Sequence, residues 1–412
     1  MNLDESVLKK EEKTAFLLRS LYQQYGCLQY KMSKFEEYDL YAKNRDFLVS
    51  DNIITFTDTN GKLMALKPDV TLSIVRNTRD IPGYVNKVFY NENVYRVSRG
   101  SHAYKEIMQA GLECIGDIDD YNIFETVLLA VKSLDIISDE NILSISHLGI
   151  IISLLQEIGL NDDEQKKAIK LIGSKNMHEL ESLCSNAAKK TAIVNMEALS
   201  DEDSINITAD NTLVNSIERV MRILMLNGSP EDILPRLREE GCNEDAVAQL
   251  EALTSMLNAA GEGSRVIIDF SVVSDMSYYN GIVFKGYVKG VPESILSGGQ
   301  YDQLLKKMGK RARAVGFAVY MDFLERYFEN DNIYDVDAVI MYDDNTDRRA
   351  LFNAVQVAMN KGMKVTAQKE VPEKLRCKII YTIDKYGALK EKQPDNTQGK
   401  NKSFNNKEAS NA

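Results

Sequence analysis

Two polar side chains, Gln109 and Glu113, stand two positions either side of Gly111 in the segment EIMQAGLECIG. Side chains alternate between the faces of a strand, so these residues share one face with Ile107 and Ile115. A buried amide or carboxylate without a partner costs roughly 1–3 kcal/mol, which favours a bound polar ligand. Gly111 is expected to leave open space for that ligand above the strand. An ordinary hairpin with one solvated face explains the same pattern equally well.

The other face of this strand predicts a core, because its side chains are all apolar. They are Met108, Ala110, Leu112 and Cys114. The wider segment, residues 87 to 116, has two strand-like runs on either side of a polar loop from Ser98 to about Lys105. The pattern predicts an antiparallel strand pair.

Other residues with possible chemistry have simpler explanations. Arg96 ends a strand, where a surface ion pair is commoner than a ligand clamp. Tyr278 and Tyr279 precede a strand, and packing is the commoner role of aromatic residues. The segment SGGQYDQLL, 297–305, places a glycine pair before a helix and could cradle an anion, although a tight turn explains it better. The residues alone predict a polar binding site and no catalyst.

Composition limits the class of protein. Of the 412 residues, 44% are hydrophobic and 27% are charged, as in globular domains. The net charge of −11 weighs against nucleic acid as the main partner, because phosphate binding needs a basic surface. No apolar run is long enough for a membrane span, so we expect a cytoplasmic protein. Five scattered cysteines and three histidines predict reduced thiols, no metal and no cofactor.

The first third of the chain reads as a helix from about 5 to 25, followed by a hairpin over 53–66. Asn60-Gly61 is a strong turn signal in this hairpin. Pro68 ends the hairpin, and Asp69 is placed to cap a following helix. A helix over 121–134 and a strand that begins near residue 142 follow.

Two changes of pattern divide the remainder. Residues from about 150 to 262 read as consecutive helices with acidic loops, which predicts a helical insertion, and strand-rich sequence then resumes up to 328. Residues 333–384 alternate strand and helix, which predicts a small α/β unit. Residues 385–412 are polar and poor in aliphatic side chains, and we expect a disordered tail.

Several segments in the right order resemble the class II aminoacyl-tRNA synthetases, in the histidyl form. KVFYNENVYRV and KEIMQAGLECIG resemble motif 2, RAVGFAVYMDFL resembles motif 3, and GCLQYKMSKFE lies at the motif 1 position. MSYYNGIVF and SGGQYDQLL look like the two histidine-specific signatures, and LKPDVT stands where the synthetase has Arg-Pro-Glu-Gly-Thr. The resemblance covers about 5–148 and 262–328. It implies an α+β fold whose antiparallel sheet is flanked by helices, with a synthetase-like core over 1–328.

The motifs also depart from the synthetase pattern. The motif 3 arginine that grips ATP phosphates aligns with Phe323, and a motif 3 glycine aligns with Tyr320. A phenyl ring cannot supply the paired donors that a triphosphate needs. Three serines replace a further catalytic arginine, the motif 1 proline and an acidic motif 2 residue: Ser274, Ser33 and Ser98. Arg96 is the ATP-contacting arginine that clearly remains, as a vestige of an ATP site.

The resemblance also implies a histidine site. Seven residues fall on its positions: Asp69, Thr71, Gln109, Glu113, Tyr278, Tyr279 and Tyr301. Asp69, Thr71 and Gln109 would take the α-ammonium, which has three donors. Glu113 and Tyr279 would address the imidazole, and Tyr301 would close the site.

A histidine site without its ATP arginines resembles the regulatory subunit of ATP phosphoribosyltransferase. That family is non-catalytic and pairs with a short catalytic subunit at the first step of histidine biosynthesis. The resemblance implies a dimer within a hetero-octamer, histidine as the effector, and no tRNA as partner. A histidyl-tRNA synthetase, or a paralogue that still activates an amino acid, is one alternative. An interaction protein whose site binds nothing is another.

Overall fold

The computed structural model describes residues 8–48, 52–97, 103–197, 206–273, 278–328, 334–384 and 387–392. The chain divides into two compact units, Met1–Phe328 and Glu329–Ala412. The predicted Ser98–Lys105 loop and the position of Ser274 fall largely or wholly outside the described residues. Among the described residues, no helix combines the length and the apolar character needed to cross a membrane.

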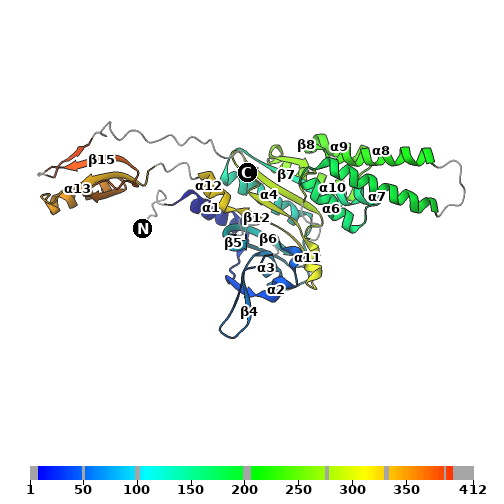
Figure 1. The fold of residues 1–412 in the computed structure, drawn as a ribbon, viewed down its shortest axis with the longest axis horizontal. Helices are drawn as coiled ribbons and strands as arrows, with labels where there is room; N and C mark the ends of the chain where they lie inside the picture. Colours follow the sequence, from blue (N-terminus) through cyan, green and yellow to red (C-terminus); the bar gives the residue numbers. More distant parts are fainter. Residues whose placement is uncertain are drawn as a thin grey trace. The chain divides into compact units, whose positions relative to one another are not determined.

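A large sheet organises the first unit (Figure 1). In the described residues its strand order is β1 (Leu28–Gln29), β5 (Val85–Val97), β6 (Tyr104–Gly116), β12 (Arg313–Tyr320), β11 (Leu296–Gln300), β10 (Ile282–Val288), β7 (Asn141–His147), β9 (Val266–Asp269) and β8 (Asn227–Gly228). β1 pairs with β5, and β7 with β9, in parallel, while the other neighbours are antiparallel. The long pair β5–β6 is the antiparallel strand pair that the sequence predicted.

One face of the sheet carries the main core. α1 (Lys10–Gln24) and α4 (Asp120–Ile137) pack there, and the apolar row of β6 faces them, as predicted. α4 begins at a capping box, in which Asp119 accepts from the backbone N–H of Asn122 at 3.0 Å. Gly286 of β10 lets Leu134 of α4 approach the strand.

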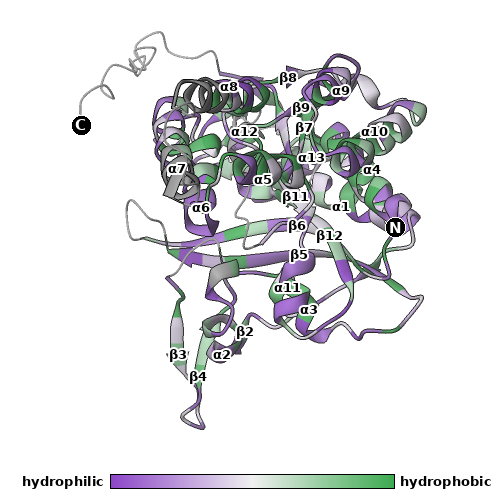
Figure 2. Cartoon of the chain, turned by 90° about the vertical axis from the view of Figure 1, so that its right-hand side faces the viewer, coloured by the Kyte–Doolittle hydropathy of each residue, from purple (hydrophilic) through white to green (hydrophobic). Residues whose placement is uncertain are grey.

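The other face is covered at one end by a smaller core. α3 (Thr71–Asn77) and α11 (Asp302–Lys307) lie below the sheet in Figure 2, on the side away from α4. A small sheet beside them has the order β2 (Phe35–Glu37), β4 (Leu63–Leu66), β3 (Thr55–Thr57), and the predicted hairpin turns at Gly61 with φ +80°. Short helices flank it: α2 (Tyr38–Ala42) and η2 (Arg45–Phe47).

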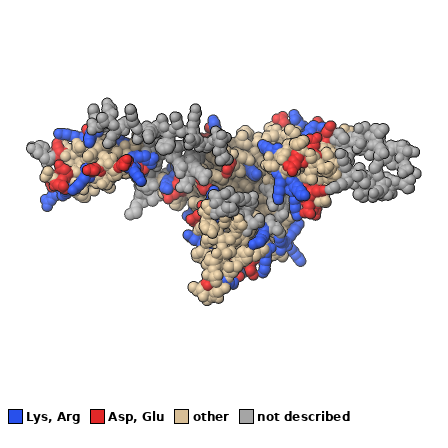
Figure 3. All heavy atoms as spheres, viewed as in Figure 1, with Lys and Arg blue, Asp and Glu red and all other residues tan. Residues whose placement is uncertain are grey.

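The predicted helical insertion is present. It contains α5 (Leu148–Glu157), α6 (Asp162–Gly173), α7 (Met177–Glu197), α8 (Asn206–Leu224), α9 (Pro230–Glu239), α10 (Glu244–Ala259) and the short η3 (Gly263–Arg265). The acidic segment LNDDEQ begins α6, because Asn161 accepts from the backbone N–H groups of Asp163 and Glu164. On the face drawn in Figure 3, Lys and Arg side chains lie among Asp and Glu side chains over these helices.

The second unit is a small α/β unit. β13 (Val336–Met341) pairs in parallel with β14 (Val365–Gln368) and β15 (Cys377–Ile383), and α13 (Arg348–Asn360) connects β13 to β14. β16 (Leu389–Glu391) pairs with β15 in antiparallel register. The expected start of the disordered tail at 385 was therefore wrong. Although this segment is polar, its backbone completes the edge of the sheet.

Candidate functional site

Glu113 is a buried carboxyl group at the centre of the predicted site. Its side chain is 3% exposed, on the β6 face that α3 and α11 cover. The Thr71 hydroxyl donates to Oε1 at 2.7 Å, and the Tyr301 hydroxyl donates to Oε2 at 2.6 Å. Burial raises the pKa of Glu113 to about 8, although both hydrogen bonds oppose this shift. Glu113 is therefore mostly protonated at neutral pH, and a cationic or N–H-donating ligand would favour its ionised form.

Glycine positions leave room for these side chains. Gly316 of β12 lies directly across from Glu113, and Glu113 Oε2 occupies the space that a Cβ at Gly316 would need. Similarly, the Tyr279 ring lies over Gly299 of β11, where a Cβ would be 2.7 Å from its Cδ1. Alanine at either position would therefore displace a site residue.

The expectation for Gly111 was wrong. Tyr90 of β5 lies across from Gly111, and its ring fills the space above that glycine. Tyr90 is 2% exposed, so this position is packed and offers no room for a ligand. A strand sequence alone does not show which neighbour supplies a side chain to a glycine gap. The cross-strand register decides it.

The glycine pair in SGGQYDQLL has a role that differs from both roles predicted for it, the tight turn and the anion cradle. Gly298 and Gly299 lie within β11, so they form neither a tight turn nor an anion cradle before α11. A Cβ at Gly298 would be 2.5 Å from the backbone oxygen of Gly316. Without side chains of their own, Gly298 and Gly299 let the Gly316 backbone and the Tyr279 ring approach β11 closely. A strand-like pattern in the sequence could have indicated this role.

Three tyrosines predicted for the site lie together. Tyr278 is 4.6 Å from Tyr279 and 5.6 Å from Tyr301, measured between ring centroids. The Tyr278 hydroxyl is hydrogen bonded to Thr71, which connects it to the Glu113 carboxyl group. Burial raises the pKa of all three phenols, so they remain neutral donors and acceptors. Thr71, Glu113 and these tyrosines are called the Glu113 cluster below.

Asp69 lies at the start of α3 and is partly exposed. Its Oδ1 accepts from the backbone N–H of Leu72 at 2.8 Å, so it caps the helix as the sequence predicted. Burial raises the pKa of Asp69, while this hydrogen bond and the positive charge of Arg96 lower it. Arg96 Nε donates to the carbonyl oxygen of Pro68 at 3.1 Å, so Arg96 supports the Asp69 segment. It does not form the predicted surface ion pair among the described residues.

Gln109 is 4% exposed and shares the sheet face of Glu113. None of the described residues forms a hydrogen bond with its amide. It lies between Glu92 of β5 and Tyr320 of β12 in the cross-strand register. A buried amide without a partner among the described residues is available to hydrogen bond with a ligand.

Sequence reasoning missed a buried ion pair beside Gln109. Lys67 has no exposed surface, and its ammonium group bonds to the Glu92 carboxylate. This pair fixes the segment before Asp69 to β5. The sequence carried no signal for this pair, because lysine is seldom fully buried and Glu92 is distant from Lys67 in the chain.

Two aromatic residues stand on the motif 3 side of the site. The Tyr320 and Phe323 rings lie edge to face with centroids 6.1 Å apart, and Phe323 packs against the main core. Tyr320 is directly across from Gln109. Ser33, at the motif 1 proline position, accepts from the backbone N–H of Phe35 at 3.1 Å.

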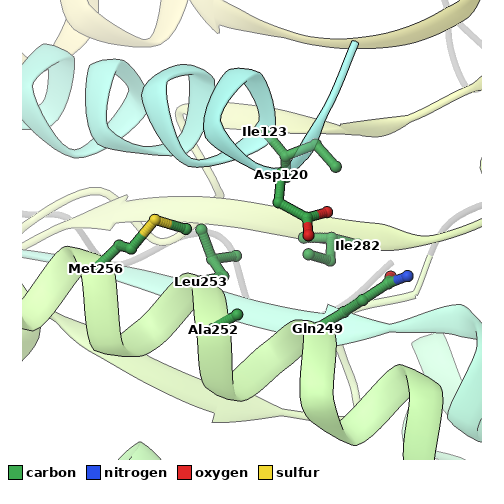
Figure 4. A pocket seen from close by; sticks show the side chains of 7 residues that line it. All are labelled: Asp120, Ile123, Gln249, Ala252, Leu253, Met256 and Ile282. Atoms are coloured by element: carbon green, nitrogen blue, oxygen red, sulfur yellow. The ribbon is translucent and has the colours of Figure 1, made fainter.

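A separate pocket lies on the α4 face of the sheet and involves none of these residues. Its lining, drawn in Figure 4, consists of Asp120, Ile123, Gln249, Ala252, Leu253, Met256 and Ile282. Ile282 belongs to the β10 row that faces the main core. This pocket is therefore distinct from the Glu113 cluster.

The geometry favours binding over catalysis. The Glu113 cluster has hydroxyl groups, a protonated carboxyl group and the neighbouring carboxyl group of Asp69, which suit a small ligand rich in N–H donors. The oxygen atoms of the cluster are hydrogen bonded to one another, and the cluster shows no nucleophile activated by a base.

Comparisons with known proteins agree with this architecture. The family model for histidyl-tRNA synthetase matches residues 2–324. A protein of Clostridium kluyveri named ATP phosphoribosyltransferase regulatory subunit is 28% identical over 368 residues, covering 86% of this chain and 88% of that protein.

Two solved structures share the fold. One, described as an ATP phosphoribosyltransferase regulatory subunit/histidyl-tRNA synthetase from Bacillus halodurans, has a TM-score of 0.64 at 24% identity, covering 89% of this chain and 90% of the other. A chain from an ATP phosphoribosyl transferase complex of Thermotoga maritima has a TM-score of 0.54 at 21% identity, covering 76% and 97%. The predicted fold class is confirmed, and the chain belongs to the histidyl-tRNA synthetase family.

Proposed function

We propose that this chain is the regulatory subunit of ATP phosphoribosyltransferase and that the Glu113 cluster binds histidine as its effector. One observation carries the proposal. On the sheet face of Glu113, the carboxyl group keeps its two hydroxyl donors, whereas the aromatic ring of Tyr320 stands across from Gln109 on the motif 3 side. The first feature suits an amino-acid site, and the second lacks the cationic groups that ATP needs. The name of the Clostridium kluyveri relative supports the same function.

The chemistry of histidine fits these side chains. Its α-ammonium has three donors, for which Asp69, Thr71 and Gln109 offer acceptor oxygens. Its imidazole would lie between Glu113 and Tyr279, with Tyr301 closing the site. Because Glu113 is protonated when the site is empty, an approaching imidazolium would stabilise the carboxylate.

The partner in this proposal is a short catalytic subunit, which requires this chain for its phosphoribosyltransferase activity and for feedback inhibition by histidine. The Thermotoga maritima complex, whose chain shares this fold, is consistent with such a pairing. We further propose a cytoplasmic hetero-octamer that contains a dimer of this chain and binds no tRNA. Histidine would inhibit only by binding one quaternary state more tightly than another, because equal affinity shifts no equilibrium.

Reconstitution tests this proposal. The chain is mixed with a short-form catalytic subunit, and phosphoribosyltransferase activity is measured with and without histidine. We expect activity only in the mixture, and inhibition by histidine. A catalytic subunit equally active alone would contradict the regulatory role.

A synthetase-like activity has one specific observation in its favour. Arg96 remains beside Asp69, held by its bond to the Pro68 carbonyl oxygen. Histidine-dependent exchange of pyrophosphate into ATP is the discriminating assay. Robust exchange would establish amino-acid activation in place of regulation, while absence of both exchange and histidine binding would leave an interaction protein with an inactive site.

A further inference from the structure

Lys285 lies on the same sheet face as the Glu113 cluster but outside it. In β10 it is directly across from Ser297 of β11 and Ser144 of β7. Ser297 is in turn across from Ala318 of β12, which is across from Gly111 of β6. Directly opposed residues of antiparallel strands share a face. One continuous row therefore leads from the Glu113 strand to Lys285.

The residues of this row that approach Lys285 have short side chains. Ala318 and Ser297 are small and partly exposed. The Tyr279 hydroxyl is hydrogen bonded to Ser297, so the Glu113 cluster borders the row directly. A ligand lying over Ala318 would pass Tyr279 and meet the Lys285 ammonium group.

Lys285 is a partly buried cation that forms no ion pair with any described residue. Burial lowers its pKa, and the negative charge of Asp269 opposes that shift. One oxygen of Asp269 accepts a 2.8 Å hydrogen bond from the backbone N–H of Ser271, and Asp269 forms no ion pair with Lys285. Lysine side chains on protein surfaces usually extend into water or pair with a carboxylate. An unpaired lysine in a partly buried row calls for another partner.

A second observation also indicates a ligand here. Ser146 of β7 has no exposed surface, and its hydroxyl has no hydrogen-bond partner within the part of the chain that the structure describes. It follows Ser144 by two residues and therefore shares the Lys285 face. Ser144 is itself 3% exposed. Leaving a buried hydroxyl unpaired is unfavourable, so these serines suit a site in which a bound group supplies the missing hydrogen bonds.

We propose that Lys285, with the hydroxyls of Ser297, Ser144 and Ser146, forms an oxyanion subsite adjoining the Glu113 cluster. An ammonium group and several hydroxyl donors match a carboxylate or phosphate. This chemistry has two possible sources, namely the carboxylate of the ligand held by the Glu113 cluster and a free phosphate. The first source rests on the proposed function, and the second does not.

Calorimetry on the full chain separates these sources. Wild type, Lys285→Met and Lys285→Arg are each titrated with L-histidine, with histamine and with inorganic phosphate. Lys289→Met is the matched control, because Lys289 lies just beyond β10 but is exposed and paired with Glu140 at 2.6 Å. Thermal unfolding of each variant shows whether it is folded.

If the subsite takes the ligand's carboxylate, Lys285→Met lowers histidine affinity by about tenfold or more, while histamine, which lacks that group, is unaffected. If it takes free phosphate, Lys285→Met abolishes phosphate binding and leaves histidine affinity unchanged. In both cases Lys285→Arg retains most of the affinity and Lys289→Met matches wild type.

The subsite is refuted if Lys285→Met, folded as wild type, changes neither titration, or if wild type binds neither ligand. If the wild type binds phosphate through Lys285 but does not bind histidine, the oxyanion subsite is supported and the proposed histidine site is contradicted. The two failures are therefore distinguishable.

Discussion

Glu113→Gln tests whether the site carboxyl group is buried and protonated. Its pKa is about 8 in the folded chain, against an ordinary value of 4.5. Between these values the unfolded chain loses its proton while the folded chain keeps it, so stability falls as pH rises. The wild type should lose about 3.5 kcal/mol of unfolding free energy between about pH 5 and about pH 8 through this group alone. Glutamine keeps the shape and does not titrate, so the variant lacks this loss.

The assay is urea unfolding of wild type and Glu113→Gln at several pH values across that range. The difference between their unfolding free energies isolates Glu113, because other groups titrate alike in both proteins. Glu106→Gln is the control on the same strand. Glu106 is exposed, and hydrogen bonds from Asn93 and Tyr95 lower its pKa, so its difference from wild type should stay flat. Parallel curves for wild type and Glu113→Gln would refute the buried, protonated carboxyl group.

Three further predictions concern the same region. Lys67→Met should destabilise the chain by about 3–5 kcal/mol in urea unfolding, because it leaves the Glu92 carboxylate unpaired. The control Lys62→Met removes an exposed ion pair and should cost under about 1 kcal/mol. Equal effects of the two substitutions would contradict the burial of Lys67. Gly316→Ala should displace the Glu113 side chain and abolish histidine binding in calorimetry, while Gly228→Ala, whose Cβ would lie 3.4 Å from Ile233, should leave it intact. Tyr301→Phe should cost about 1–3 kcal/mol of stability by removing the donor to Glu113 Oε2, and no measurable change would show that this hydrogen bond is absent.

Much of the fold was predictable because its signals are local. Asn60-Gly61 specifies a turn that the structure contains. The acidic stretch expected to be a loop is instead the first turn of α6, which Asn161 caps. The alternation in β6 correctly separated an apolar face from a polar one. Periodicity and capping require only neighbouring residues, so they can be read without knowledge of the tertiary fold.

The site was less predictable because cross-strand register builds it. Gly111 alone suggested open space, but its partner across the strands is Tyr90. Gly316 attracted no attention in the sequence, although it makes room for Glu113. Nothing in the sequence indicated that Lys67 is buried, because its partner Glu92 lies on a distant strand. Residue spacing within one segment does not contain this information.

Histidine inhibition of the reconstituted complex tests the central claim most directly. Activity of the short catalytic subunit with this chain is measured against histidine concentration, using wild type, Glu113→Gln and the control Glu106→Gln. The proposed histidine site predicts inhibition that wild type and Glu106→Gln share and that Glu113→Gln shows only at roughly tenfold or higher histidine concentration. Identical inhibition curves for all three proteins would contradict it.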